Sequence, residues 1–169
     1  RAFAELHQLS NAFANNKYTT AKNKAIEALK LSGDSLFMLN LLGKCFMKTG
    51  EFESALKFME KAQSISPGNI ERLCNIAEVQ YDLGMKEEAK QTIADATALD
   101  PSSTMVKEID AEIALLSGDA SRAKRIMASL DTLPNIVSFM NNRAVALTRC
   151  GNFEEGIQLY KDTFSALPG

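Results

Sequence analysis

The sequence predicts an all-α fold in which helical hairpins follow one another as a linear array. Three observations lead to this prediction. Small residues recur at a fixed step of 34 residues, so that Gly50 returns as Gly84 and Gly118, and Ala55 returns as Ala89. Apolar residues lie three or four positions apart between these points, which is the period of an α-helix. Glycine or proline separates the helical runs. Repetition at this step is typical of stacked hairpins rather than of a single closed core.

The period divides the chain of 169 residues into five repeats, which are 2–35, 36–69, 70–103, 104–136 and 137–169. Each repeat should form two antiparallel helices joined by a short turn. The fourth repeat is one residue short and matches the pattern only weakly, keeping Ala111, Gly118, Ala123 and Met127. Because the sequence begins with Arg1 and not with Met, we expect it to be a piece of a longer protein.

The second repeat shows the pattern most clearly. Its two helical runs are separated by "KTGEF", in which Gly50 suits the left-handed turn that ends a helix. Lys48 lies in the final turn of the first run, where a positive charge favours the helix dipole. Pro67 should stop the second run, since proline lacks an amide donor and clashes with the preceding turn. The apolar positions at helical spacing are Leu39, Leu42, Phe46, Phe52, Leu56 and Met59.

The small residues have a packing role in this interpretation. Two helices that approach to about 8–10 Å need a side chain of little volume where they cross. Gly43 on the first run and Ala55 on the second provide it, and Ala62 does the same against the next repeat. A bulky residue at Gly43 should overpack the contact and cost about 1–3 kcal/mol.

The remaining repeats keep this pattern with single departures. The third repeat has Gln80 where an aromatic residue is expected, with Tyr81 beside it. The fifth repeat has Gly156 in place of the alanine of its second helix. The first repeat has Gly33 where the closing proline would stand. None of these changes alters the prediction of two helices per repeat.

These co-occurring positions resemble the tetratricopeptide repeat, and the resemblance covers the whole chain. It implies a right-handed superhelix of about five hairpins. In such proteins the first helices line a concave groove that takes a peptide or a partner helix. The groove positions that the resemblance carries onto this sequence are Phe3, Phe13, Phe37, Asn40, Lys44, Met47, Glu71, Asn75, Glu78, Tyr81, Asp82, Glu108, Glu112 and Asn141.

The charge of this expected groove is uneven. Its N-terminal half is apolar and basic, and its C-terminal half carries the acids Glu71, Glu78, Asp82, Glu108 and Glu112. A partner segment with an apolar ridge and a basic patch would complement the acidic half. Two alternatives stay open. The acids could simply keep the face soluble, and the aromatic residues could pack between repeats: Phe3, Phe13, Phe37 and Tyr81.

One subclass of the family grips a C-terminal carboxylate with Lys, Asn and Arg side chains. The corresponding places hold Asn40, Lys44 and Asn75, but Met105 and Ile109 stand where further cations are expected. We therefore expect this chain to lie outside that subclass.

The last helical run should leave one apolar side uncovered, because the outermost repeat of an array has no neighbour beyond it. Ile157 lies on this side together with three candidates for self-association, which are Tyr160, Phe164 and Leu167. A homodimer through the uncapped C-terminal hairpin is the main alternative to capture of a partner in the groove. The chain would then be a structural dimerisation arm.

Composition and motifs argue against several other classes. A net charge of −2 gives no electrostatic footprint for nucleic acid, and no apolar run approaches the roughly 18 residues of a membrane span. Cys45, Cys74 and Cys150 lack the spacing of a disulfide framework or a metal site, so we expect buried thiols in the reducing cytoplasm. The single histidine, His7, has no catalytic constellation near it, and no catalytic residue, metal or cofactor is predicted.

We interpret the sequence as a non-catalytic scaffold for protein–protein interaction. The style of the fifth repeat, "FMNNRAVALTRCGNFEEGIQLY", is similar to that of bacterial tetratricopeptide modules. This similarity suggests the interaction module of a bacterial signalling or motility protein.

Overall fold

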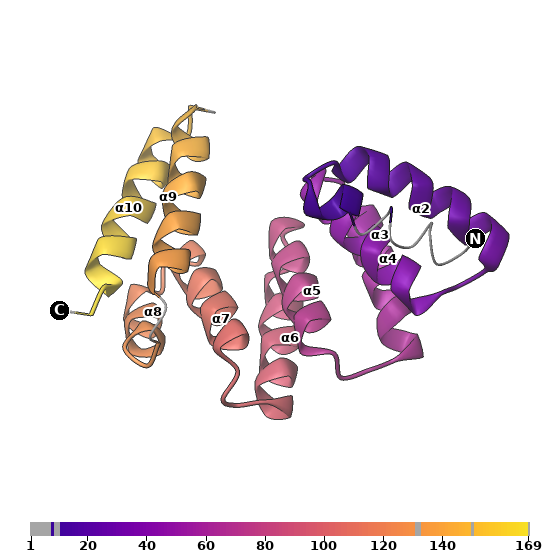
Figure 1. Cartoon of the computed structure of the whole chain (residues 1–169). Coiled ribbons are helices and arrows are strands. Elements are labelled where there is room, and N and C mark those ends of the chain that lie inside the picture. Colours follow the sequence, from indigo (N-terminus) through magenta and orange to yellow (C-terminus); the bar gives the residue numbers. More distant parts are fainter. Residues whose placement is uncertain (1–7, 9–10, 131–132, 150, 169) are drawn as a thin grey trace. The chain divides into compact units, whose positions relative to one another are not determined.

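The computed structural model of the chain describes residue 8 and residues 11–130, 133–149 and 151–168 (Figure 1). In this part of the chain every regular element is a helix, which confirms the all-α prediction. The chain divides into two compact units, Arg1–Leu99 and Asp100–Gly169, called here the N-terminal unit and the C-terminal unit. Phe3, His7 and Cys150 lie outside the described residues.

The N-terminal unit is built from helical hairpins. Residues 11–14 are helical, and they precede α2 (Tyr18–Ser32), α3 (Leu36–Lys48), α4 (Phe52–Ile65), α5 (Ile70–Asp82) and α6 (Lys86–Leu99). Figure 1 shows α3 beside α4 and α5 beside α6, and α4 also packs against α5. Leu42, Met59 and Val79 meet in the core of this unit, so residues from three successive helices share one apolar interior.

The C-terminal unit contains α7 (Thr104–Leu116), α8 (Ala120–Met127), α9 (Leu133–Arg149) and α10 (Phe153–Ala166). α7 packs on α8, and α9 packs along α10. α8 has only 8 residues and lies in the fourth repeat, whose sequence pattern is weak. α9 begins at Leu133, ahead of residue 137, where the fifth repeat was expected to start. Pro134 is compatible with this early start because the first turn of a helix does not need its amide donor.

The turns within the hairpins have the geometry that the sequence predicts. Gly50 and Gly84 follow α3 and α5 with φ angles of 77° and 81°, in the left-handed region that glycine enters without steric cost. The amide of the residue after each glycine, Glu51 or Met85, donates to the carbonyl of Phe46 or Gln80. These bonds satisfy carbonyls that the end of each helix would otherwise leave open.

Small residues occupy the positions of Gly43 and Ala55 in four hairpins. Each pair has one residue from the first helix and one from the second, and all eight residues are buried. In the fifth repeat the glycine and the alanine are interchanged between the two helices. Gly156 stands at the position of Ala55, and Ala144 stands at the position of Gly43. The four pairs are Gly43 with Ala55, Ala77 with Ala89, Ala111 with Ala123, and Ala144 with Gly156.

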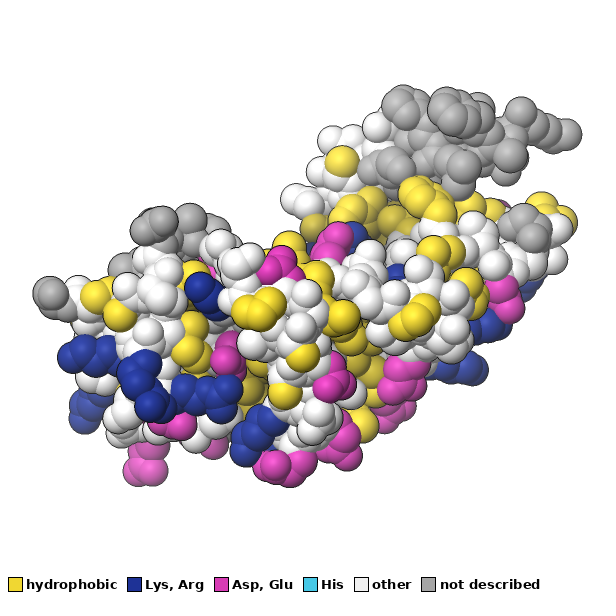
Figure 2. Space-filling view, turned by 90° about the horizontal axis from the view of Figure 1, so that it is seen from below, with side chains coloured by type: hydrophobic (Ala, Val, Ile, Leu, Met, Phe, Trp, Pro, Cys, Tyr) yellow, Lys and Arg dark blue, Asp and Glu magenta, His cyan; other side chains and the backbone are white. Residues whose placement is uncertain are grey.

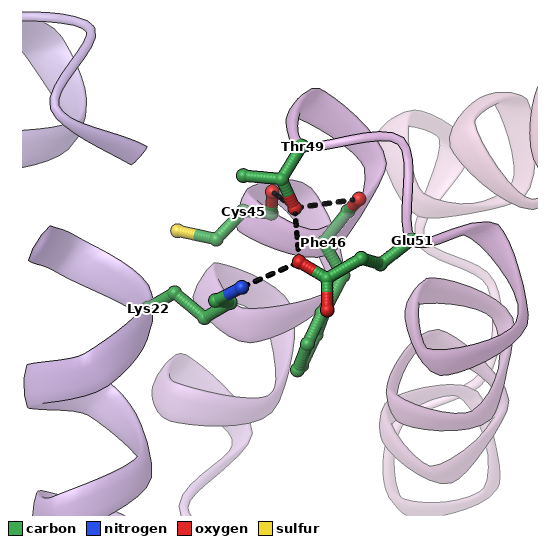
Figure 3. Close-up of polar contacts among 5 residues, drawn as sticks. All are labelled: Lys22, Cys45, Phe46, Thr49 and Glu51. Carbon is green, nitrogen blue, oxygen red and sulfur yellow. Dashed lines mark hydrogen bonds and ion pairs between the residues drawn. The ribbon is translucent and has the colours of Figure 1, made fainter. Parts of the chain in front are cut away.

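A polar cluster joins α2 to the turn between α3 and α4 (Figure 3). Lys22 of α2 forms an ion pair with Glu51, and its ammonium group lies 5.3 Å from the ring centroid of Phe46. The Thr49 hydroxyl donates to Glu51 Oε1 at 2.8 Å. Hydrogen bonds from Lys22 and then from Thr49 hold the pKa of the Glu51 carboxyl below its ordinary value. Burial raises the pKa of the neighbouring Cys45 thiol to about 11, although the charge of Lys22 acts in the opposite direction.

Candidate functional site

The first helices α3 and α5 lie close enough for their side chains to meet. Lys44 of α3 forms an ion pair with Glu71 of α5. These two residues, together with Asn40 and Asn75, line a small cavity of about 60 Å³ between the helices. We define the α3–α5 face as the six residues Phe37, Asn40, Lys44, Glu71, Asn75 and Tyr81.

Arg72 lies beneath this face and connects α3, α4 and α5. It is only 4% exposed, and its guanidinium donates to Gln63 Oε1 at 2.9 Å, to Asn40 Oδ1 at 3.0 Å and to the carbonyl of Ser66. Burial lowers the pKa of Arg72, yet a guanidinium stays cationic in proteins. Arg72 therefore fixes the Asn40 side chain, a role that was not predicted from the sequence. The sequence does contain a signal for this role, which is an arginine among the apolar positions at the start of the third repeat.

The groove residues predicted in the N-terminal unit differ in their surroundings. Phe37 is an exposed aromatic residue at the start of α3. Tyr81 is half-buried, and the Lys86 ammonium lies 5.9 Å from its ring centroid. Phe13 and Met47 instead pack against the core, and Phe13 makes an edge-to-face contact with Tyr18. For Phe13 this is the contact that the packing alternative describes, whereas Met47 was predicted only as a groove residue.

The acids predicted to line the groove are not uniformly presented at the surface. Glu71 is paired with Lys44, so the basic and acidic halves of the expected groove meet at this ion pair. Glu78, Asp82 and Glu108 are half-buried and each has an interaction partner. Glu112 is 8% exposed, and it also has a partner. We therefore leave Glu112 out of the proposed binding surface, because a partner molecule could not reach a buried carboxylate.

Basic side chains also reach the surface of the C-terminal unit. α8 carries Arg122, Lys124 and Arg125 within its eight residues, and Arg122 forms an ion pair with Asp110 at 2.9 Å. Figure 2 shows one face of the molecule, where dark-blue basic side chains are most numerous at the lower left and occur again at the right, and apolar side chains lie between acidic and polar ones. The surface of this unit thus carries both basic and acidic side chains.

A larger cavity lies between α9 and α10. Its volume is about 520 Å³, and it brings Asn141, predicted as a groove residue, together with all three residues predicted for self-association. The sequence pattern had placed these residues on two different surfaces. The full lining is Val137, Ser138, Asn141, Tyr160, Thr163, Phe164 and Leu167.

Comparison with known families agrees with the hairpin architecture. Two sequence profiles described as tetratricopeptide repeat match the chain, one over residues 8–70 and the other over residues 47–113. Together these matches span more than half of the chain. The chain belongs to the tetratricopeptide repeat family, whose members are generally scaffolds for protein–protein interaction. No curated protein was found to match the sequence.

Several solved structures share this fold at low sequence identity. A thermophilic tetratricopeptide protein of Thermus thermophilus has a TM-score of 0.71 and 18% identity, over 99% of this chain and 92% of that chain. YrrB, a tetratricopeptide protein with an unusual peptide-binding site, has a TM-score of 0.64 and 16% identity, over 99% and 87%. The second such domain of human RPAP3, in complex with the HSP70 peptide SGPTIEEVD, has a TM-score of 0.60 and 19% identity, over 66% and 93%.

Two kinds of feature are absent from the described residues. None of their helices combines the length and the apolar character that crossing a membrane requires. Their His, Cys, Asp and Glu side chains form no group of three or more that could hold a metal ion.

Proposed function

We propose that the chain is a non-catalytic protein-binding module that holds a partner segment on the α3–α5 face. The observation that carries this proposal is the placement of the two first helices side by side, linked by the Lys44–Glu71 ion pair and by the bond from Arg72 to Asn40. These contacts fix the helices before a partner arrives. A pre-ordered surface loses little conformational entropy on binding, which favours affinity.

The chemistry of the face fits a polypeptide ligand. Asn40 and Asn75 have carboxamide side chains, which offer both donor and acceptor groups and so match the backbone amides of a peptide. Phe37 at one end of α3 and Tyr81 toward the end of α5 can contact apolar side chains of the ligand. Aromatic residues of this kind often contribute a large share of the energy of an interface.

The proposed partner is a protein or peptide segment with apolar side chains and a basic patch. The basic patch of the partner would complement Glu78 and Asp82 of α5. Glu108 of α7 is a further acid, in the C-terminal unit. A C-terminal carboxylate is a poorer candidate, since Lys44 is already paired with Glu71 and the negative charge of Glu71 would repel it. The peptide complex of the RPAP3 domain supports peptide capture by this fold in general.

The wider setting that we propose is a bacterial signalling or motility protein in the cytoplasm. The style of the fifth repeat and the likeness to a protein of Thermus thermophilus support a bacterial origin. Cys45 and Cys74 are buried as thiols and not joined in a disulfide, which is the usual state of cysteine in a reducing compartment.

The proposal is tested by capture of partners from a lysate of the source organism. The intact chain is compared with a Tyr81→Ala, Glu78→Lys variant and with a Lys57→Ala control, in which the exposed change lies on the second helix α4. A protein retained by the intact chain and the control, but lost by the double variant, supports binding on this face. Equal retention by all three would contradict the proposal, provided that circular dichroism shows the same thermal unfolding for each.

We propose a second candidate function, which is self-association through the C-terminal hairpin. It is favoured by the apolar cavity between α9 and α10 and by the exposure of Phe164, which is 72% accessible at the cavity edge. Gel filtration with light scattering over a dilution series tests it, and a strict monomer would contradict it.

A further inference from the structure

We propose that α10 pairs with the α10 of a second copy of this chain, in antiparallel orientation, through one apolar stripe. This inference rests on the second candidate function, self-association, and is independent of the α3–α5 face. The stripe consists of four residues of α10 and the residue just after it. They are Phe153, Ile157, Tyr160, Phe164 and Leu167.

The repeats themselves show that this surface accepts a helix. At the position of Tyr160, the second repeat has Met59, which is 2% exposed in a core to which the next helix, α5, also contributes. A short connection makes α5 antiparallel to α4. Tyr160 instead lines an open cavity. The corresponding place on α10 can therefore accept an antiparallel helix.

The exposure of the stripe is unlike that of its counterpart in α4. Phe153, Ile157 and Phe164 are 62%, 50% and 72% exposed. The positions in α4 that correspond to Phe153 and Ile157 hold Phe52 and Leu56, which pack into the core. A row of large exposed apolar side chains on one helix face marks an interaction site in a soluble protein.

The spacing of the stripe identifies α10 itself as a suitable partner. Its residues follow one another at intervals of four, three, four and three, which is the heptad pattern of helices that pair along a seam. In an antiparallel pair with this register, Phe153 faces Phe164 of the other copy, and Ile157 faces its Tyr160. Phe153 of each copy would then enter the cavity of the other beside Phe164.

The charges that flank the stripe select the antiparallel orientation. Glu154 and Lys161 are exposed, and they are seven residues apart, so they lie along the same flank of the stripe. The other flank contains Gly156 and Thr163, which are buried. In an antiparallel pair, like flanks meet, and Glu154 of each copy faces Lys161 of the other. A parallel pair would place the charged flank against the buried one.

Charge-reversal variants test this arrangement without disturbing the core. Glu154→Lys and Lys161→Glu should each raise the dimer dissociation constant by about three- to tenfold at low salt, because two attractive pairs become repulsive. The double variant restores opposite charges and should regain the original constant. An equimolar mixture of the two single variants should form a mixed dimer in preference to either homodimer. Glu155→Lys makes the same change of charge off the stripe and should have no effect.

Sedimentation equilibrium from micromolar to submillimolar concentration gives these constants. Phe164→Ser should abolish the dimer while circular dichroism shows an intact fold, since this side chain is exposed. A monomer at every concentration overturns both the α10 pairing and self-association. This holds even if the stripe binds a helix of another protein. A dimer that Phe164→Ser leaves intact, or that shows no rescue in the double variant, overturns the α10 pairing while self-association through another surface stands.

Discussion

Gly43 and Met59 approach so closely that a β-carbon on Gly43 would lie 2.6 Å from Cγ of Met59. The same β-carbon would lie 3.7 Å from the carbonyl oxygen of Ala55, at ordinary contact distance. The crossing of α3 and α4 is thus limited by one side chain and not by the backbone. This contact gives a physical reason for the glycine in the second repeat, and it confirms the role that the sequence assigned to it.

Replacing Gly43 by alanine should lower the free energy of unfolding by about 1–3 kcal/mol, through overpacking against Met59. The higher helical propensity of alanine, worth about 1 kcal/mol, offsets part of this loss. Urea unfolding of Gly43→Ala, Met59→Ala and the double variant measures the coupling. The cost of Gly43→Ala should nearly vanish when Met59 is already alanine. An equal cost in both backgrounds would contradict the contact.

The sequence predicted most of the fold, because the features that produce it are local and repeat. Gly50 and Pro67 end helices through their own backbone restrictions, and the small residues recur in the second to fifth repeats. The short α8 and the early start of α9 were not predicted. At that point the repeat pattern is weak, and the packing of the C-terminal unit decides the helix ends.

The candidate site was less predictable, because it depends on contacts between repeats. The pairing of Lys44 with Glu71 and the burial of Glu112 follow from how adjacent helices pack, which a pattern within one helix does not report. Gln80 is a similar case. It occupies an aromatic position, yet it is buried and accepts a hydrogen bond from the Thr92 hydroxyl at 2.7 Å. A polar pair here replaces an aromatic packing contact.

Removing Arg72 should destabilise the N-terminal unit strongly. Arg72→Ala leaves the half-buried oxygens of Gln63 and Asn40 without their donor, and the expected loss is about 1–3 kcal/mol. The exposed Lys57→Ala change on α4 is the control and should stay within about 0.5 kcal/mol of the original. Hydrogen exchange of the amides in α3–α5 reports the effect. Unchanged protection in Arg72→Ala would contradict the role of this residue.

The Glu51 cluster predicts a pH dependence of a definite sign. The pKa of Glu51 is lowered in the folded chain, so its contribution to stability is present above the unfolded value of about 4.3 and is lost as pH falls through the folded value. Glu51→Gln should therefore unfold more easily than the original chain at neutral pH. The difference should shrink in acid. Thermal unfolding of both proteins from neutral to acidic pH measures it, and a difference independent of pH would contradict the ion pair with Lys22.

Cys45 should be inert to alkylation in the folded chain. Its thiol is buried and its pKa is raised to about 11, so the reactive thiolate is scarce at neutral pH. Iodoacetamide labelling followed by peptide mass spectrometry should show modification of Cys45 only after denaturant is added. Rapid labelling under native conditions would contradict the packing of α3 against α2 and α4.

The central prediction is that partners bind the face formed by α3 and α5. Nuclear magnetic resonance titration of the isotope-labelled chain with a captured partner segment tests it most directly. We expect amide and side-chain shifts to concentrate at Asn40, Lys44, Asn75 and Tyr81, while α4 and α6 change little. Shifts confined to α4 and α6, or to α10, would contradict it.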